Sequence, residues 1–137
     1  STAASDKEAT RLAHRENREA APRGRPQASA TSGGSKGEVA AILGDLQQRA
    51  THARSLALAK VVQRALKKAR PKAKDRGVRQ APFDVLLGLK MPGVLVEVGF
   101  IDHIIEGKQM VDRAVQGRIA EALASGIKAY LQRRPRR

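Results

Sequence analysis

Apolar residues recur three and four positions apart in three stretches of the chain, a spacing that places them on one face of a helix. The first stretch, residues 6–20, begins at a capping box made by Ser5 and Glu8. Its apolar stripe is narrow, so a helix here buries little area alone and needs another surface to lie against. The stripe consists of Ala9, Leu12 and Ala13.

The second stretch predicts a long helix. A capping box of Ser35 and Glu38 marks its start, and Pro71 ends it because proline lacks the amide that a helix requires. The pattern allows a break near Thr51 and His52. The apolar positions are Val39, Ile42, Leu43, Leu46, Ala50, Leu56, Ala59, Val62 and Leu66.

The third stretch predicts a helix over residues 108–132, followed by a basic tail at 133–137. Its apolar residues again return at helical spacing, so one side should face a core. They are Met110, Val111, Ala114, Val115, Ile119, Leu123, Ile127 and Tyr130.

Two short runs between the second and third helices have the composition of strands. They are residues 83–87 and 94–98, and Lys90-Met91-Pro92-Gly93 separates them. The second run is apolar on both faces, as is typical of a central strand covered by helices on each side. The predicted fold class is therefore α/β, with a central sheet and helices on both sides.

The segment 21–35 differs in composition from its neighbours. It is rich in Pro, Gly, Ser, Ala and Thr and has no periodic apolar positions, which predicts a flexible linker. Residues 36–132 should then form the α/β portion. A chain of 137 residues lies within the usual range for one domain, so we expect residues 1–137 to belong to one domain.

The charge balance is strongly basic. Lys and Arg number 27 against 13 Asp and Glu, and the resulting net charge of +14 favours polyanionic partners. Nucleic-acid modules usually add aromatic residues for stacking, whereas this chain has only Phe83, Phe100 and Tyr130. This argues against nucleic acid as a partner. A basic, non-enzymatic module that binds an anionic polymer remains an alternative function.

Several kinds of site and segment are absent from the sequence. The chain has no cysteine, which excludes disulfides, thiolate zinc sites and cysteine nucleophiles. It has no apolar run of membrane-spanning length and no signal peptide. An export signal for a protein that works outside the cytoplasm would therefore lie upstream.

Glu97 is the anomaly in the second strand-like run. A carboxylate among apolar residues is costly unless it is paired, protonated or at the open end of the strand. Two interpretations remain open from the residues alone. Glu97 is either a structural partner of a neighbouring Arg or a catalytic group at the carboxyl end of a strand, where α/β sheets bind ligands.

A longer motif surrounds Glu97. Residues 78–86 (Val-Arg-Gln-Ala-Pro-Phe-Asp-Val-Leu) and 91–101 (Met-Pro-Gly-Val-Leu-Val-Glu-Val-Gly-Phe-Ile) resemble the closing motif of zinc-dependent N-acetylmuramoyl-L-alanine amidases. The chain is identified by this resemblance as the C-terminal half of the three-layer amidase fold. Upstream segments similar to division-type amidases are 4–9, 15–17, 39–46 and 55–56.

The resemblance implies a function. Enzymes of this family are hydrolases that cut the amide between N-acetylmuramic acid and L-alanine in peptidoglycan, using zinc to polarise the carbonyl and a separate glutamate to move the proton. Glu97 matches that glutamate. The resemblance also implies peptidoglycan as partner, divisome-linked activator proteins as further partners, a part in cell division or autolysis, and a periplasmic or cell-wall location.

The resemblance places the zinc ligands of the family outside this chain. The family's zinc ligands, two histidines and a glutamate, lie N-terminal to the start of this chain, so the resemblance implies zinc in the complete enzyme, none bound by this chain alone, and no activity of the chain alone. His14, His52 and His103 fall in different elements and lack the spacing of a helical zinc site, so we expect structural or exposed roles. His103 also departs from the Ser-Asn that relatives commonly have after the glycine-aromatic-aliphatic run.

The first predicted helix has a second interpretation. It occupies the place of a segment that, in division-type amidases, can lie across the active site and block it, and Glu16 would then reach the zinc. The alternative is a solvated charge on a weak helix, because nothing in residues 21–35 would fix the helix in a blocking position.

Overall fold

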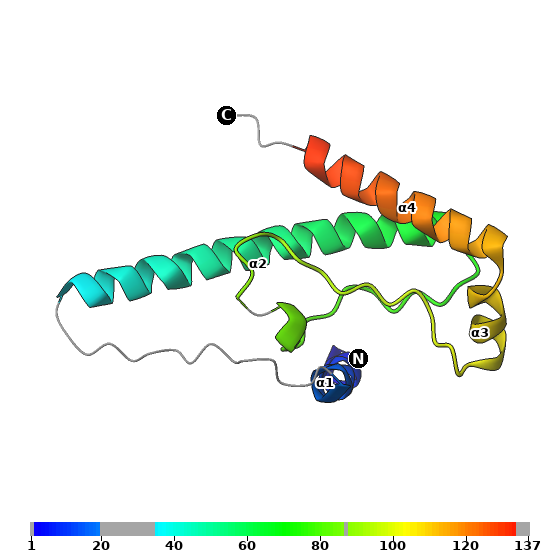
Figure 1. The fold of residues 1–137 in the computed structure, drawn as a ribbon, viewed down its shortest axis with the longest axis horizontal. Coiled ribbons are helices and arrows are strands. Elements are labelled where there is room, and N and C mark those ends of the chain that lie inside the picture. Colours follow the sequence, from blue (N-terminus) through cyan, green and yellow to red (C-terminus); the bar gives the residue numbers. More distant parts are fainter. Residues whose placement is uncertain (1, 20–34, 87, 134–137) are drawn as a thin grey trace. The chain divides into compact units, whose positions relative to one another are not determined.

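The computed structural model describes residues 2–19, 35–86 and 88–133 of the chain. Within these ranges the chain forms α-helices joined by irregular segments and a short 3₁₀ helix, η1 (Figure 1). The elements are α1 (Thr2–Glu19), α2 (Ser35–Ala69), η1 (Asp84–Leu86), α3 (Ile104–Met110) and α4 (Arg113–Gln132). None of these helices is both long and apolar enough to cross a membrane.

The chain divides into two compact units. Unit 1 consists of residues 1–54 and 79–92, and unit 2 consists of residues 55–78 and 93–137. The long helix α2 therefore contributes its first part to unit 1 and its last part to unit 2. Glu97, α3 and α4 all belong to unit 2, whereas α1 and η1 belong to unit 1.

In unit 1, the narrow apolar stripe of α1 is buried as its composition requires. Ala9 and Ala13, one helical turn apart, are 4% and 1% exposed. Asn17 ties the same helix to the segment around η1. Its Nδ2 donates to the carbonyl oxygen of Pro82 at 2.8 Å, and its Oδ1 accepts from the amide of Asp84 at 2.8 Å.

Helix α2 is continuous from Ser35 to Ala69, so the break considered near Thr51 and His52 is not present. Its Ala, Leu, Gln, Lys and Arg residues are strong helix formers. The helix ends where Pro71 disfavours helical geometry at the residue before it. The apolar residues of α2 differ in exposure along the helix. Val61 and Val62, in the part that belongs to unit 2, are buried. Four large apolar residues in the part that belongs to unit 1 are more than half exposed: Val39, Ile42, Leu43 and Leu46.

The third predicted helix is two helices. Asp112 interrupts it, because its carboxylate accepts from the amides of Ala114 at 2.7 Å and Val115 at 3.3 Å and so caps the start of α4. The residues before it form the separate helix α3. Helix α4 then buries Val115, Ile119, Ala122 and Gly126, at the spacing of one helical face.

The predicted α/β fold is wrong for this chain. No strand occurs in the part of the chain that the structure describes: residues 84–86 form η1, and residues 93–99 have no regular structure. The physical reason is that a strand is completed only by a neighbour that pairs with its backbone, so β-branched composition alone does not make one. The described structure is helical, with no central sheet.

Two further expectations lie outside the described residues. The predicted linker, apart from Ser35, falls in the range 20–34, and most of the basic tail falls in 134–137.

Candidate functional site

Glu97 lies in the irregular segment of unit 2 that precedes α3. Exposure alternates along this segment: Leu95 and Glu97 are exposed, and the apolar residues between and beside them, Val94, Val96 and Val98, are half-buried. This is the period of two that an extended chain gives when one side faces solvent. The Glu97 carboxylate is therefore accessible, on the face opposite to the one that Val98 uses for packing.

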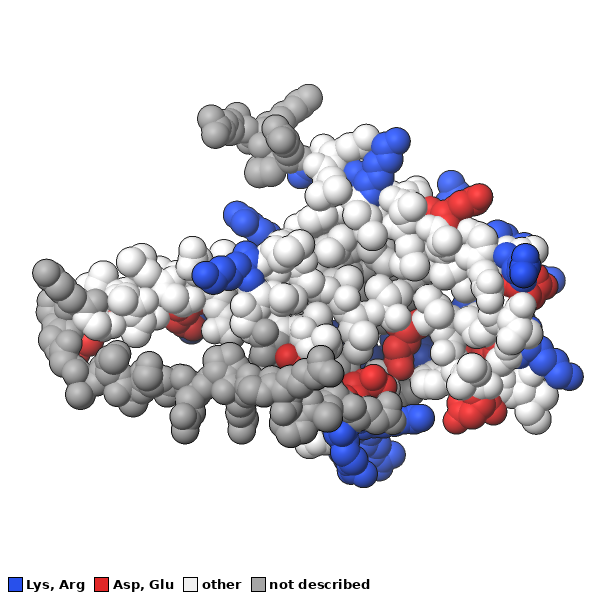
Figure 2. Space-filling model, viewed as in Figure 1, with Lys and Arg blue, Asp and Glu red and all other residues white. Residues whose placement is uncertain are grey.

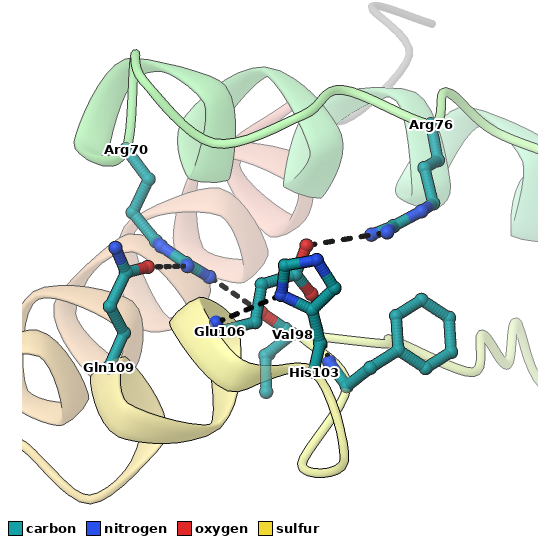
Figure 3. A network of polar contacts seen from close by, with 7 residues as sticks. Arg70, Arg76, Val98, His103, Glu106 and Gln109 are labelled. Carbon is teal, nitrogen blue, oxygen red and sulfur yellow. Dashed lines mark hydrogen bonds and ion pairs between the residues drawn. The ribbon is translucent and has the colours of Figure 1, made fainter.

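Hydrogen bonds from α2 and the residue after it fix both ends of this segment. At its start, the Gly93 amide donates to Ser55 Oγ at 3.1 Å. Immediately after Glu97, the Val98 carbonyl oxygen accepts from Nη1 of Arg70. The other Arg70 nitrogen, Nη2, donates to Gln109 Oε1 at 3.0 Å, so one guanidinium joins this segment to α3 (Figure 3).

Glu106, in the first turn of α3, holds the next part of the segment. Its Oε2 accepts from the Phe100 amide at 3.0 Å, and its Oε1 accepts from Arg76 Nη2 at 3.3 Å (Figure 3). The pKa of Glu106 lies below its ordinary value, chiefly because the Phe100 amide stabilises the charged carboxylate and further because Arg76 is cationic. The carboxylate is thus held in its charged form between two donors.

Arg76 is itself held in place from two sides. Its guanidinium carbon lies 4.5 Å from the centre of the Phe100 ring, within the range of a cation–π contact. The preceding residue, Asp75, accepts from the Gly77 amide at 2.9 Å, and Gly77 has the positive φ of +72° that glycine adopts without strain. Lys67 of α2 lies 3.1 Å from the other Asp75 oxygen, which ties this turn back to the helix.

An apolar pocket of about 470 Å³ lies behind the same segment. Val98, on the opposite face to Glu97, contributes to it together with residues of α3 and α4. The lining residues are Val98, Gly99, Ile101, Met110, Gln116, Ile119, Ala120 and Leu123. Its walls offer hydrophobic contact.

Two of the three histidines, His103 and His52, make hydrogen-bond contacts with other protein groups. His103 is the N-cap of α3, where its Nδ1 accepts from the Glu106 amide at 3.3 Å. His52 Nε2 lies 3.2 Å from Gln80 Oε1 within unit 1. Across the described residues, no group of three or more His, Asp or Glu side chains is placed to hold a metal ion.

The comparisons with known proteins identify the family. Residues 26–129 match the N-acetylmuramoyl-L-alanine amidase family. The chain belongs to this family. The expected family resemblance is thereby confirmed, and the matched range includes both Glu97 and the network around it.

Individual proteins named as amidases of this kind are similar to the chain in sequence. The chain is 37% identical over 86 residues, 63% of its length, to the N-acetylmuramoyl-L-alanine amidase AmiC of Escherichia coli O6:H1. It is 37% identical over 91 residues, 65% of its length, to AmiA of Escherichia coli K12, and 35% identical over 57 residues, 42% of its length, to LytC of Bacillus subtilis.

The matches cover only part of these relatives. The aligned region spans 20% of AmiC, 30% of AmiA and 12% of LytC. No solved structure matches the chain.

Sequence reasoning singled out Glu97 and missed the residues around it. Arg70, Arg76 and Glu106 lie in stretches of the sequence to which no role was assigned. One signal was available: Asp75 followed by Gly77 is typical of a tight turn, and such a turn fixes the direction of the residue between them. The glutamate that this turn faces, 30 positions along the chain, has no comparable signal.

Proposed function

We propose that the chain supplies the C-terminal portion of a zinc-dependent N-acetylmuramoyl-L-alanine amidase, with Glu97 as its catalytic carboxylate. The observation that carries the proposal is the family match over residues 26–129. An exposed carboxylate in the middle of the motif that resembles the family's closing segment supports it. The substrate is the amide that joins N-acetylmuramic acid to L-alanine in peptidoglycan.

Glu97 acts in this proposal as general base and then general acid. Its carboxylate takes a proton from the water whose oxygen bonds to the amide carbonyl carbon. The carbon–nitrogen bond then breaks, and Glu97 gives the proton to the departing nitrogen. The products are the free lactyl carboxylate of the sugar and the free amine of L-alanine, and Glu97 returns to its starting charge.

The zinc ion belongs to the complete enzyme in this proposal. The described residues of this chain do not fit a zinc site, since their His, Asp and Glu side chains do not come together in threes. We assign no zinc ligand to them, and a blocking role of Glu16 in α1 stays a prediction. The chain alone is accordingly expected to be inactive.

Partner and location follow from the substrate. An enzyme that cuts peptidoglycan works where that polymer lies, in the periplasm or the cell wall. Divisome-linked activator proteins are the proposed regulatory partners, as the resemblance to division-type amidases implies. The relatives named AmiC and AmiA are themselves N-acetylmuramoyl-L-alanine amidases, which supports the substrate class.

The alternative of a basic module for anionic polymers has less support. On the face shown in Figure 2, Lys and Arg stand in separate groups with Asp and Glu between them, and they form no continuous basic surface. Phe100, one of the three aromatic residues, carries the Arg76 guanidinium over its ring, so that face is not free for base stacking.

Digestion of purified peptidoglycan by the complete enzyme tests the proposal. Labelling of new amino groups followed by hydrolysis should reveal L-alanine as the only newly exposed amino acid, with no new reducing sugar ends. New reducing ends would indicate a glycosidase, and a different amino-terminal residue would indicate a peptidase. Either result would overturn the proposed function.

A further inference from the structure

The backbone that carries Glu97 has no secondary structure to hold it. Residues 93–99 belong to no helix, and the structure contains no strand in its described ranges that could fix them. A general acid–base must nevertheless point at one atom of its substrate, since small displacements of a reacting group cost large factors in rate. Something other than regular structure must therefore define the direction of Glu97.

The contacts that follow Glu97 provide this definition. Its neighbour Val98 is bonded through its carbonyl to Arg70, and the Phe100 amide is bonded to Glu106. These bonds lie one and three residues after Glu97, so the chain cannot rotate there without breaking them. Figure 3 shows Arg70 reaching the Val98 carbonyl oxygen and Arg76 reaching the Glu106 carboxylate.

Glu106 and Arg76 contact each other, and both contact Phe100. Glu106 uses one oxygen for the Phe100 amide and the other for Arg76, while Arg76 also covers the Phe100 ring. The three groups therefore close a ring of contacts around one residue. Loss of the Glu106 carboxylate would release the Phe100 amide and one of the two contacts that hold Arg76 over the Phe100 ring.

The Arg76–Glu106 pair is also shielded, unlike a typical surface ion pair. The two side chains are 30% and 18% exposed, whereas those of the Arg49–Asp45 pair on α2 are 77% and 58% exposed. Water and salt screen the first pair less than the second. Such a pair holds its geometry better than one that stands free in solvent.

We propose that Arg76 and Glu106 are positioning residues for Glu97: they fix the backbone at Phe100 and so the direction in which the Glu97 carboxylate points. This inference rests on the proposed function. Neither residue touches substrate in the proposal. Their effect reaches the reaction through the backbone, so it should appear in the turnover rate and leave substrate affinity largely intact.

The test uses the zinc-loaded complete amidase with two substitutions of Glu106. Glu106→Gln keeps an oxygen that can accept from the Phe100 amide but loses the charge that pairs with Arg76, whereas Glu106→Ala loses both. We expect kcat to fall by roughly tenfold for Gln and by about a hundredfold for Ala, with KM within about twofold of wild type. Zinc content should not change.

The matched control is Asp112→Ala, which removes the cap of α4 in the same unit without touching residues 98–100. It should lower the melting temperature and leave kcat near wild type. Hydrogen exchange of the Phe100 amide should speed up most in Glu106→Ala, less in Glu106→Gln, and not in the control. If Glu106→Ala does not fold, Glu106→Gln and Arg76→Lys decide the question by the same measurements.

The outcomes separate the two claims. Glu106 variants that melt earlier, as the control does, but keep their kcat would overturn the positioning role while leaving the amidase proposal intact. An active Glu97→Gln enzyme would instead remove the proposed function on which the positioning role rests. A graded loss of kcat from Gln to Ala, with the control active, supports the inference.

Discussion

Gly126 of α4 faces Val62 of α2 so closely that an added Cβ would press against the backbone of α2. A Cβ at position 126 would lie 3.1 Å from the Val62 Cα and 3.3 Å from the Ala65 Cβ. Both neighbours sit on a helix, so they cannot move aside as a flexible side-chain end would. The close contact of α2 and α4 therefore leaves little room for a side chain at position 126.

We therefore predict that Gly126→Leu destabilises the chain by about 1–3 kcal/mol, the usual cost of overpacking. Urea unfolding followed by circular dichroism measures this. The control is Gly117→Ala in the same helix, where an added Cβ meets nothing within 4 Å and alanine should be stabilising by about 0.5–1 kcal/mol. Equal stability of the Gly126→Leu variant and wild type would show that the two helices are not packed this closely.

A second prediction concerns Asn17, whose amide bridges two backbone groups of the η1 segment. Asn17→Ala removes both hydrogen bonds, at about 1–2 kcal/mol in total for groups that are only partly shielded from water. The amide of Asp84 should then exchange with solvent faster, as measured by NMR. His14→Ala, at an exposed position of the same helix, should not alter that exchange. Unchanged protection of Asp84 in the Asn17 variant would contradict the contact.

A third prediction concerns the cap of α3. His103 accepts through Nδ1, which requires that this nitrogen carry no proton. His103→Ala should cost about 0.5–2 kcal/mol, whereas His103→Asn should retain the cap because asparagine is among the preferred N-cap residues. Thermal unfolding of the two variants beside wild type is the measurement. Equal losses for Ala and Asn would argue that His103 contributes packing and no cap.

The fourth prediction is a loss of stability in acid. The pKa of Glu106 is lowered, first by the Phe100 amide, and the pKa of Asp75 is lowered, first by the Gly77 amide and then by Gln63 and Lys67. The unfolded chain then binds protons at a higher pH than the folded chain. The stabilisation is present above the ordinary carboxylate pKa of about 4 and is lost as pH falls through the folded values.

Urea midpoints measured from pH 7 to pH 2 test this. They should be nearly constant near neutrality and fall below about pH 4. Glu106→Gln, which has no carboxylate to protonate, should show a shallower decline. A variant with the same acid slope as wild type would mean that Glu106 is not paired in the folded state.

The helices could be predicted from the sequence, because helical periodicity and breakers are local signals. Pro71 predicted the end of α2, and the capping-box sequence that begins at Ser35 predicted its start, in agreement with the observed helix Ser35–Ala69. The division between α3 and α4 was missed because Met110 and Val111 continue the apolar pattern of α4 across Asp112, whose hydrogen bonds mark a new helix start.

The sheet could not be predicted correctly, because a strand depends on a neighbour that the local pattern does not specify. Val94, Val96 and Val98 have strand-like composition and even the alternating exposure of a strand, yet they pair with no other strand in the described structure. Glu97 stood out because it breaks an apolar run. Arg76 and Glu106 did not, since each is an ordinary charged residue until the fold brings them within 3.3 Å.

The central claim is that Glu97 moves the proton in amide hydrolysis, and one substitution tests it most directly. Glu97→Gln keeps the size and hydrogen bonding of the side chain but cannot transfer a proton. Turnover of the zinc-loaded complete enzyme on peptidoglycan should fall by roughly a hundredfold or more, with metal content and melting temperature unchanged. An enzyme that keeps near wild-type turnover per folded molecule but melts earlier would show that Glu97 is a structural carboxylate and contradict the account.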